Sequence, residues 1–337
     1  MTLFIKYIAS DTGTPTPCAG TDPVWLAHSI RLTLADAVNT PISKARVNVP
    51  CRIHVFVDST SATYTPSSDP ADNDLKVRVQ AWVCRPGTAG VGPGTAIASS
   101  PTQIQSILGT VAPGLTGTTF FDWTPQPGDL PTGATETHLC IGANCFWTNA
   151  IGDPAAPPTE GGPLVAPATI DICNIRRHAQ RNITLLSATA PGSMAMQFIA
   201  GGLEEGGEVE IRIREVRGRR ELLPVEQEFL VADGVARLLK GEQLVLAGGK
   251  KMPIYTGAQE DARVELRTRE EAGERLRLRL KPGELVPVEI HLELPEDEPG
   301  LVRAFDVVQE GREGEVIGGL RLLTVAALEE GGKQTTS

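Results

Sequence analysis

Residues 275–280 read Arg-Leu-Arg-Leu-Arg-Leu, an alternation of charged and apolar side chains with a period of two. Successive side chains of a β-strand point to opposite faces, so this stretch predicts a strand with buried leucines and solvated arginines. The same alternation occurs in residues 208–214 and, after the turn Lys281-Pro282-Gly283, in residues 286–292. This part of the chain therefore predicts a sheet that buries one face.

Similar patterns extend the β prediction over the rest of the chain. Strands are expected at residues 30–34, 51–57, 75–83, 137–147 and 320–325, the last after a Gly318-Gly319 turn. The one plausible helix is a short segment near Thr102–Leu108. About seven strands in the second half make an immunoglobulin-like sandwich the default architecture. The predicted fold class is all-β, with antiparallel sandwiches.

Length and composition predict two domains joined by a linker. A chain of 337 residues exceeds what one hydrophobic core usually organises. All Trp and Cys residues lie within residues 1–178, most charged residues lie after residue 178, and Pro and Gly concentrate at residues 149–171. We expect a β-sandwich with an N-terminal strand segment at 1–148, a Pro/Gly-rich linker at 149–178, a charged immunoglobulin-like sandwich at 179–328 and a disordered tail at 329–337.

The charges indicate what the chain does not bind. The formal net charge of −10, with basic side chains mixed among acidic ones, argues against nucleic acid as a partner. Glu208 and Glu210 are expected to pair across strands with the Arg275–Arg279 row, and such dense networks are typical of thermophile proteins. No apolar run is long enough to span a bilayer, and the first residues lack the apolar stretch of a secretory signal.

Six cysteines, an even number confined to one half, are candidates for disulfides within or between subunits. They are Cys18, Cys51, Cys84, Cys140, Cys145 and Cys173. If Cys51 opens one strand and Cys84 closes the next antiparallel strand, the two lie at the same end of a sheet. Two alternatives stay open: buried free thiols, or a zinc site that combines Cys140 and Cys145 with His138, His178 or Cys173.

No catalytic or cofactor motif is found. The chain lacks G-x-S-x-G, H-E-x-x-H, P-loop and dinucleotide-binding patterns, and acidic pairs such as Glu204–Glu205 lie in loop contexts. His54 and His138 fall within strand patterns, where a histidine with satisfied structural contacts is expected. We therefore predict no enzyme activity, no catalytic or metal-binding residues and no cofactor.

Several short motifs carry a family resemblance. They are residues 21–26 (Thr-Asp-Pro-Val-Trp-Leu), 78–82 (Arg-Val-Gln-Ala-Trp), 121–125 (Phe-Asp-Trp-Thr-Pro) and 138–143 (His-Leu-Cys-Ile-Gly-Ala). They resemble an uncharacterised bacterial β-sandwich module found alone or appended to secreted proteins. Residues 179–183 resemble its exit into a second sandwich, whose Pro299-Gly300 and Gly318-Gly319 turns are similar to those of bacterial immunoglobulin-like domains. The resemblance implies no catalytic residues.

The tryptophans admit two interpretations. Trp25, Trp82, Trp123 and Trp147 would form a carbohydrate platform if they lay on one exposed face. Core packing is the favoured alternative, because Trp82 occupies a mid-strand position like the core Trp of immunoglobulin sandwiches.

These observations favour a structural protein that self-assembles into an extracellular filament or surface layer. Leu3, Phe4, Ile5 and Tyr7 form a candidate assembly strand that could complete a neighbour's sheet edge. The expected partner is the protein itself, at the cell surface or outside the cell. The alternative is an accessory module that binds a carbohydrate, such as a surface polysaccharide, or a protein. An enzyme would instead need a cleft that joins His138 or His178 to a carboxylate.

Overall fold

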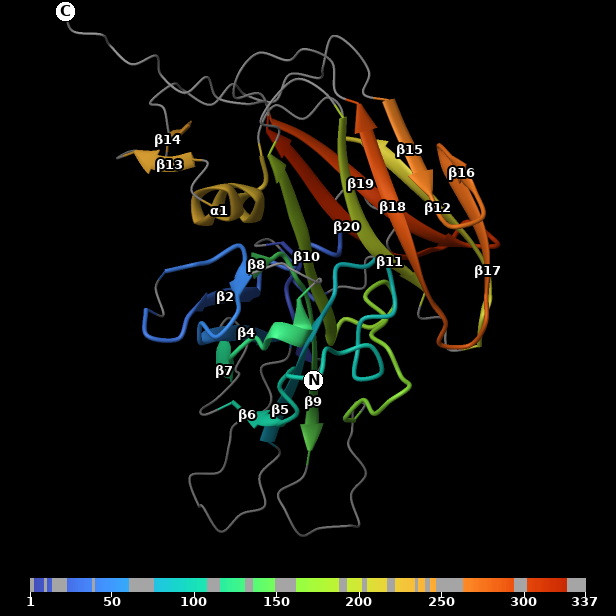
Figure 1. Cartoon of the computed structure of the whole chain (residues 1–337). Coiled ribbons are helices and arrows are strands. Elements are labelled where there is room, and N and C mark those ends of the chain that lie inside the picture. The colour runs from blue at the N-terminus through green and yellow to red at the C-terminus, as the bar shows by residue number, and fades with distance from the viewer. Residues whose placement is uncertain are drawn as a thin grey trace, which may run out of the picture.

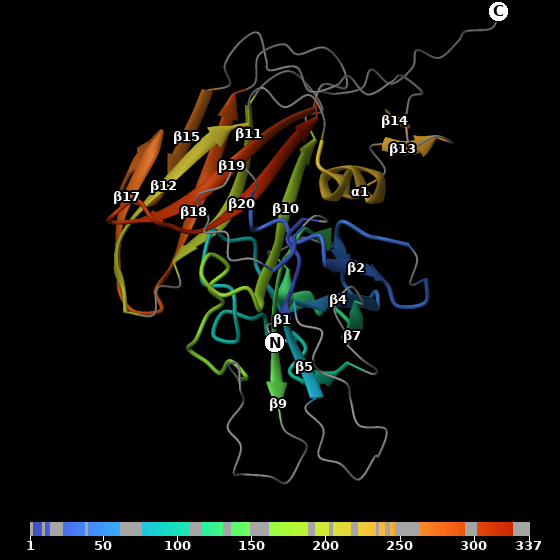
Figure 2. The same ribbon diagram turned by 180° about the vertical axis from the view of Figure 1, so that it is seen from behind.

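The computed structural model describes residues 3–8, 11–13, 23–37, 40–60, 76–107, 116–130, 136–148, 162–187, 193–201, 205–216, 222–233, 236–239, 243–246, 263–293 and 302–325. Over these ranges the chain is almost entirely β, as predicted, and its sheets are mainly antiparallel. Figures 1 and 2 show the strands gathered in two regions that meet along β10 (His178–Ser187).

The first region is a sandwich around a core of small and β-branched side chains. One layer contains β1 (Leu3–Phe4), β2 (Ile30–Leu34) and β7 (Gly117–Trp123), which all pair with β4 (Cys51–Ser59). The other contains β5 (Lys76–Cys84), β6 (Gln105–Ser106) and β9 (Cys140–Thr148). The odd-numbered residues of β4 and β5 from Ile53 to Val83 meet between the layers, as their alternation predicts. Short elements complete it: β3 (Ala45–Arg46), η1 (Pro127–Asp129) and β8 (Glu136–Thr137).

The second region is also a two-layer sandwich. One layer is formed by β12 (Gly207–Glu215), β17 (Arg275–Leu280), β19 (Val302–Gly311) and β20 (Val316–Val325). The other is formed by β11 (Ser193–Gly201), β15 (Arg263–Arg267), β16 (Ala272–Gly273) and β18 (Leu285–Glu293). Phe198, Ile211, Leu276, Ile290 and Phe305 are buried between them.

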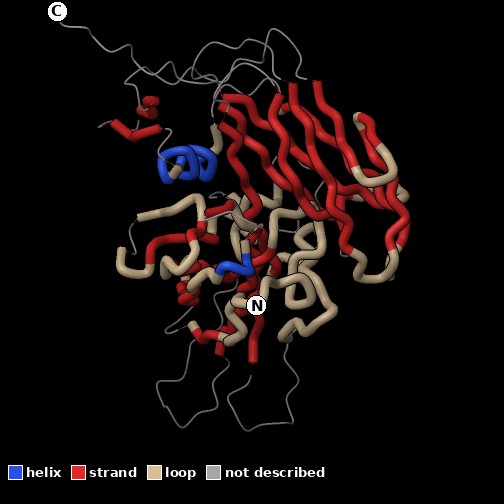
Figure 3. The backbone as a smooth tube through the Cα atoms, viewed as in Figure 1, coloured by secondary structure: helices blue, strands red, loops and turns tan. Residues whose placement is uncertain are grey.

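One eight-stranded sheet passes through both regions, in the order β17-β12-β19-β20-β10-β9-β5-β6. Residues 178–182 of β10 pair antiparallel with β9, and residues 183–187 pair parallel with β20. Strands on the two sides of the expected linker therefore bond to a single shared strand (Figure 3). The expected domain limits stay a prediction.

A third core lies at the junction of the two sandwiches. It combines Trp25 and Trp82 from the first region with Leu323 from the second and Phe229 and Leu230 from the helix α1 (Pro224–Ala232). The same core includes Ile170 and Ile172, which belong to the expected linker. This part of the expected linker is therefore packed against the body of the protein, whereas Val165 is exposed.

Helix α1 was not expected from the sequence, although it carries start signals. Pro224 occupies its first turn, and the Glu226 carboxylate accepts a hydrogen bond of 2.7 Å from the N–H of Leu223. The strands β13 (Ala236–Leu239) and β14 (Gln243–Leu246) follow as a separate pair. Residues 224–232 mix apolar and acidic side chains without a long periodic stretch, so their pattern alone does not predict the helix.

Two local predictions were wrong. Residues 102–107 are not helical, because Gln105 and Ser106 instead pair with Val79 and Arg78 of β5; Leu108 lies outside the described residues. Gly318 and Gly319 are not a turn but part of β20. A Cβ atom at Gly318 would lie 2.1 Å from the carbonyl oxygen of Thr88, so a loop of the first sandwich packs directly on this strand.

The other predicted strands are confirmed, with the 137–147 segment divided between β8 and β9. Of the expected cross-strand ion pairs, that of Glu210 is confirmed: Glu210 lies opposite Arg277 and accepts a hydrogen bond of 3.0 Å from its Nε. Residues 299–300 and the tail 329–337 lie outside the described part of the chain.

Candidate functional site

The candidate assembly strand at the N-terminus belongs to its own chain's sheet. Leu3 and Phe4 pair with Ser59 and Asp58 of β4, and both are buried together with Ile5. Tyr7 is half-buried, and its ring centroid lies 5.1 Å from the guanidinium carbon of Arg176. Addition of this segment to a neighbour stays a prediction, and it would require β1 to leave the core that it now completes.

Four of the six candidate disulfide cysteines are buried and form no disulfide bond: Cys51, Cys84, Cys140 and Cys145. The expected Cys51–Cys84 geometry is wrong, because β4 and β5 belong to different sheets and the residue opposite Cys84 is Cys140. Burial raises the pKa of Cys51 to about 12, with a smaller contribution from Asp122, so this thiol stays protonated. Cys173 is disulfide-bonded, and Cys18 lies outside the described residues.

The two histidines considered for a metal or catalytic site make structural contacts. His138 Nε2 lies 3.6 Å from Asp233 Oδ1, and its ring packs on Phe229 at 5.3 Å between centroids. His178 Nδ1 accepts a 2.8 Å hydrogen bond from the N–H of Asp171. Burial lowers the pKa of His178 to about 4, so it is neutral in this position near neutral pH. Across the described ranges, no group of three potential ligands is placed to hold a metal ion.

Three tryptophans pack in the interior, in agreement with the favoured interpretation. Trp25, Trp82 and Trp123 are each at most 6% exposed, and the side chain of Trp147 lies outside the described residues. Trp123 Nε1 donates a hydrogen bond of 2.7 Å to Ser99 Oγ, which satisfies its one polar atom. These three side chains are therefore unable to form an exposed platform.

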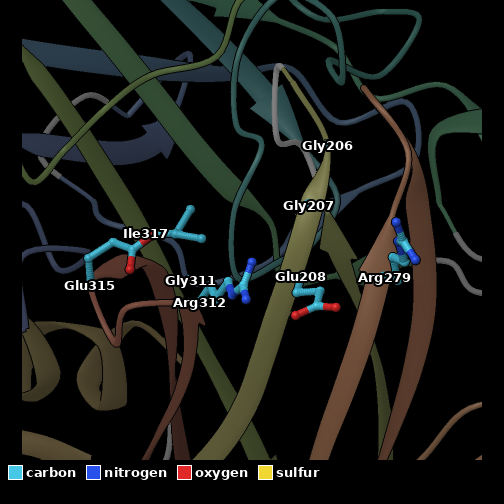
Figure 4. Close-up of a pocket in the computed structure, with 8 residues that line it drawn as sticks. All are labelled: Gly206, Gly207, Glu208, Arg279, Gly311, Arg312, Glu315 and Ile317. Atoms are coloured by element: carbon cyan, nitrogen blue, oxygen red, sulfur yellow. The ribbon is translucent and has the colours of Figure 1, made fainter.

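A polar pocket of about 410 Å³ lies where the start of β12 meets the turn between β19 and β20. Figure 4 shows Glu208 and Arg279 on neighbouring strands, with Arg312 and Glu315 contributed by the turn. A Cβ atom at Gly311 would lie 1.8 Å from the carboxylate of Glu315, so a side chain there would displace this carboxylate. The eight lining residues include both charge signs but no Ser, Thr, Cys or His, so they offer no hydroxyl, thiol or imidazole for covalent chemistry.

Over the described residues, strand β11 has an open edge at Ala195 and Gln197. Its partner β18 lies on one side. On the other side Ile199 bonds to the backbone of Pro86 and Thr88, and Gly201 bonds to the side chain of Gln309. Because hydrogen-bonding directions alternate along a strand, the N–H and C=O groups of Ala195 and Gln197 point the same way as those of Ile199. Within the described part of the chain they have no backbone partner on that side, and both residues are exposed.

The described helices include none long and apolar enough to cross a membrane. No family model and no curated protein matches the chain.

Two solved structures of bacterial adhesins show a weak likeness to the chain. The CupB6 tip adhesin from Pseudomonas aeruginosa is 10% identical, with 84% of this chain and 92% of that chain covered and a TM-score of 0.20. CfaE, the adhesive subunit of CFA/I fimbria of enterotoxigenic Escherichia coli, is 9% identical, with 97% and 93% covered and a TM-score of 0.21. At such low scores the chain is related to these adhesins by no more than a distant likeness between β-rich structures.

Proposed function

We propose that this protein is a non-enzymatic structural protein of an extracellular filament or surface layer, and that copies associate through the open edge of β11. The observation that carries the proposal is the composition of that edge. Residues 193–198 read Ser-Met-Ala-Met-Gln-Phe, without a charge, a proline or a glycine. Natural sheets usually block exposed edges with lysine, proline, bulges or very short strands, because an open edge is a template for another strand.

The edge contrasts with the strands beside it. Exposed positions of β18 and β15 carry Glu289, Glu293, Arg263 and Arg267. These charged side chains would lose water if a second copy covered the sheet face, whereas β11 brings no charge to its own edge. Two β11 strands meeting antiparallel would pair uncharged residues and continue the four-stranded layer from one copy into the next.

The contacts at the junction favour a rigid unit. Helix α1 reaches both sandwiches: Glu228 pairs with Arg181 at 3.1 Å, and Asp233 at its end accepts a hydrogen bond of 2.7 Å from Ser43 Oγ. On its other side Glu226 pairs with the buried Arg321 of β20. A shared sheet and these ties favour a unit that keeps its shape inside an assembly.

Light scattering coupled to size-exclusion chromatography, followed by electron microscopy, tests the proposal on the full chain. The wild type should form oligomers or filaments as its concentration rises. The double variant Ala195→Lys/Gln197→Lys should remain monomeric, because four lysines would face one another across the paired edges. Gln103→Lys makes the same type of change at an exposed loop position and should assemble like the wild type.

Two results would contradict the proposal. A wild type that stays monomeric at high concentration would show that the chain does not self-associate. Oligomers that persist in the double lysine variant would show that another surface, such as an exchanged β1 strand, joins the copies.

A further inference from the structure

A cluster of aromatic and charged side chains lies on the outer face of the sheet formed by β2, β4 and β7. Strand registry brings Arg31, His54 and Phe120 into one row, because His54 lies opposite both others. Arg52 lies opposite Asp122 in the next row, and Phe56 opposite Thr118 in the row on the other side. We call Arg31, Arg52, His54, Phe56, Phe120 and Asp122 the aromatic face.

The rings and guanidinium groups of the aromatic face support one another. The Arg52 guanidinium carbon lies 4.0 Å from the centroid of the Phe120 ring, and that of Arg31 lies 5.5 Å from the Phe56 ring. The His54 ring lies between the two phenylalanines, with centroid separations of 6.4 Å to Phe56 and 6.5 Å to Phe120. Such cation–π and ring contacts hold the side chains in defined positions before any ligand arrives.

Phe120 is the unusual member of this cluster. It is 47% exposed. An exposed phenylalanine ring forgoes the stabilisation that burial of its apolar surface would give. Its neighbours in β7, Phe121 and Trp123, alternate into the core as the pattern requires. Exposed apolar area rimmed by polar groups is typical of an interaction site.

The charges of the aromatic face are balanced within the molecule. Arg52 binds Asp122 through two hydrogen bonds of 2.6 and 3.0 Å, and Arg31 lies 3.6 Å from Glu228. Burial, Arg52 and Arg31 lower the pKa of His54, and its Nε2 lies 3.0 Å from the Thr33 hydroxyl. The surface therefore offers planar polar groups and rings without a net charge, which disfavours a highly charged partner.

We propose that the aromatic face binds a neutral polysaccharide. The negative face of an aromatic ring attracts the positively polarised C–H groups of a sugar ring, and Phe120 offers a half-exposed ring next to the Arg52 guanidinium. The paired Arg52 and Asp122 offer donors and acceptors to sugar hydroxyl groups. Adjacent strands lie about 4.8 Å apart and alternate residues about 7 Å apart, so the three rows suit an extended chain rather than an enclosed small molecule.

The test measures retention of the full-length protein on insoluble cellulose, chitin and β-1,3-glucan, and its affinity electrophoresis in gels with dextran or starch. At least one of these neutral polymers should bind the wild type. Phe120→Ala should weaken that binding about tenfold or more, because it removes the exposed ring but no core atom. Leu285→Ala removes an apolar side chain of similar exposure, 43%, from the other sandwich and should bind like the wild type.

Binding should persist at about 0.5 M salt, because a neutral ligand gains little from screened charges. Failure of every polymer to retain the protein would overturn the proposal, as would equal binding by Phe120→Ala and the wild type. If Phe120→Ala instead changes the self-association measured by light scattering, the aromatic face contacts protein and the glycan proposal is wrong. This inference is independent of the β11 edge, since the double lysine variant should keep its polysaccharide binding.

Discussion

Two networks of arginine and glutamate in this protein use the same chemistry in opposite surroundings. On the outer face of the second sandwich, Glu210 accepts from Arg277, whose side chain is 85% exposed. At the junction, Arg321 pairs with Glu226, and both side chains are 1% exposed. The difference teaches that the location of an ion pair, rather than its residue types, decides what it contributes to the free energy of unfolding.

Each nitrogen of the Arg321 guanidinium donates a hydrogen bond within the buried network. Arg321 Nε and Nη2 donate to the two oxygens of Asp306 at 2.8 and 3.1 Å, while Nη1 donates to Glu226. Burial alone would lower the pKa of Arg321, but Asp306 and Glu226 raise it above its ordinary value. Each member therefore depends on the others, since an unpaired charge in this position would have no water to solvate it.

The largest effect should come from Arg321→Met. Methionine fills a similar volume but leaves the buried carboxylate of Glu226 without its cation, and breaking a buried pair in this way costs about 3–5 kcal/mol. Urea unfolding at pH 7 should show this loss as a lower midpoint. A loss below about 1 kcal/mol would mean that water reaches the junction and that the network is not buried in solution.

The pH dependence of stability gives a second, smaller test of buried polar groups. The folded-state pKa of His178 is lowered from 6.5 to about 4, mainly by burial, so folding favours the neutral ring. Its contribution is present above the unfolded pKa of 6.5 and is lost as the pH falls toward 4, by about 2 kcal/mol between pH 7 and pH 5.

Urea unfolding of the wild type and of His178→Gln at pH 7 and pH 5 measures this contribution. Glutamine can accept the hydrogen bond from Asp171 but does not titrate, so the variant should lose less stability than the wild type over that range. Identical slopes in the two proteins would contradict a buried, neutral His178.

The sequence allowed the outer network to be predicted but not the buried one, for a physical reason. Alternation reveals which face of a strand is apolar, and Glu210 and Arg277 were correctly expected on solvated faces. Arg321 shows the limit of this rule. It lies between Leu320 and Leu322, which enter the second sandwich, and its own face is covered by α1 and the junction core.

The candidate surfaces illustrate the same limit. Tryptophan is the usual signal of a binding platform, but Trp25, Trp82 and Trp123 pack in the core. The aromatic face is instead assembled from strands far apart in sequence, so Phe56 and Phe120 give no local pattern that reveals it. The sequence pattern does not reveal the open edge of β11 either, because strand order depends on tertiary pairing rather than on the residues of one strand.

The smallest effect should come from Glu210→Gln on the outer face. Glu210 is approached by Arg277 at 3.0 Å, Arg212 at 2.9 Å and Arg275 at 3.8 Å, so its loss leaves three arginines with less compensation. Because solvent screens these charges, the expected loss is only about 0.2–1 kcal/mol, and it should shrink further at about 1 M salt. Urea unfolding at low and high salt measures both values. A salt-independent loss as large as that of Arg321→Met would mean that the outer arginines are covered in solution, for example by a second copy of the chain.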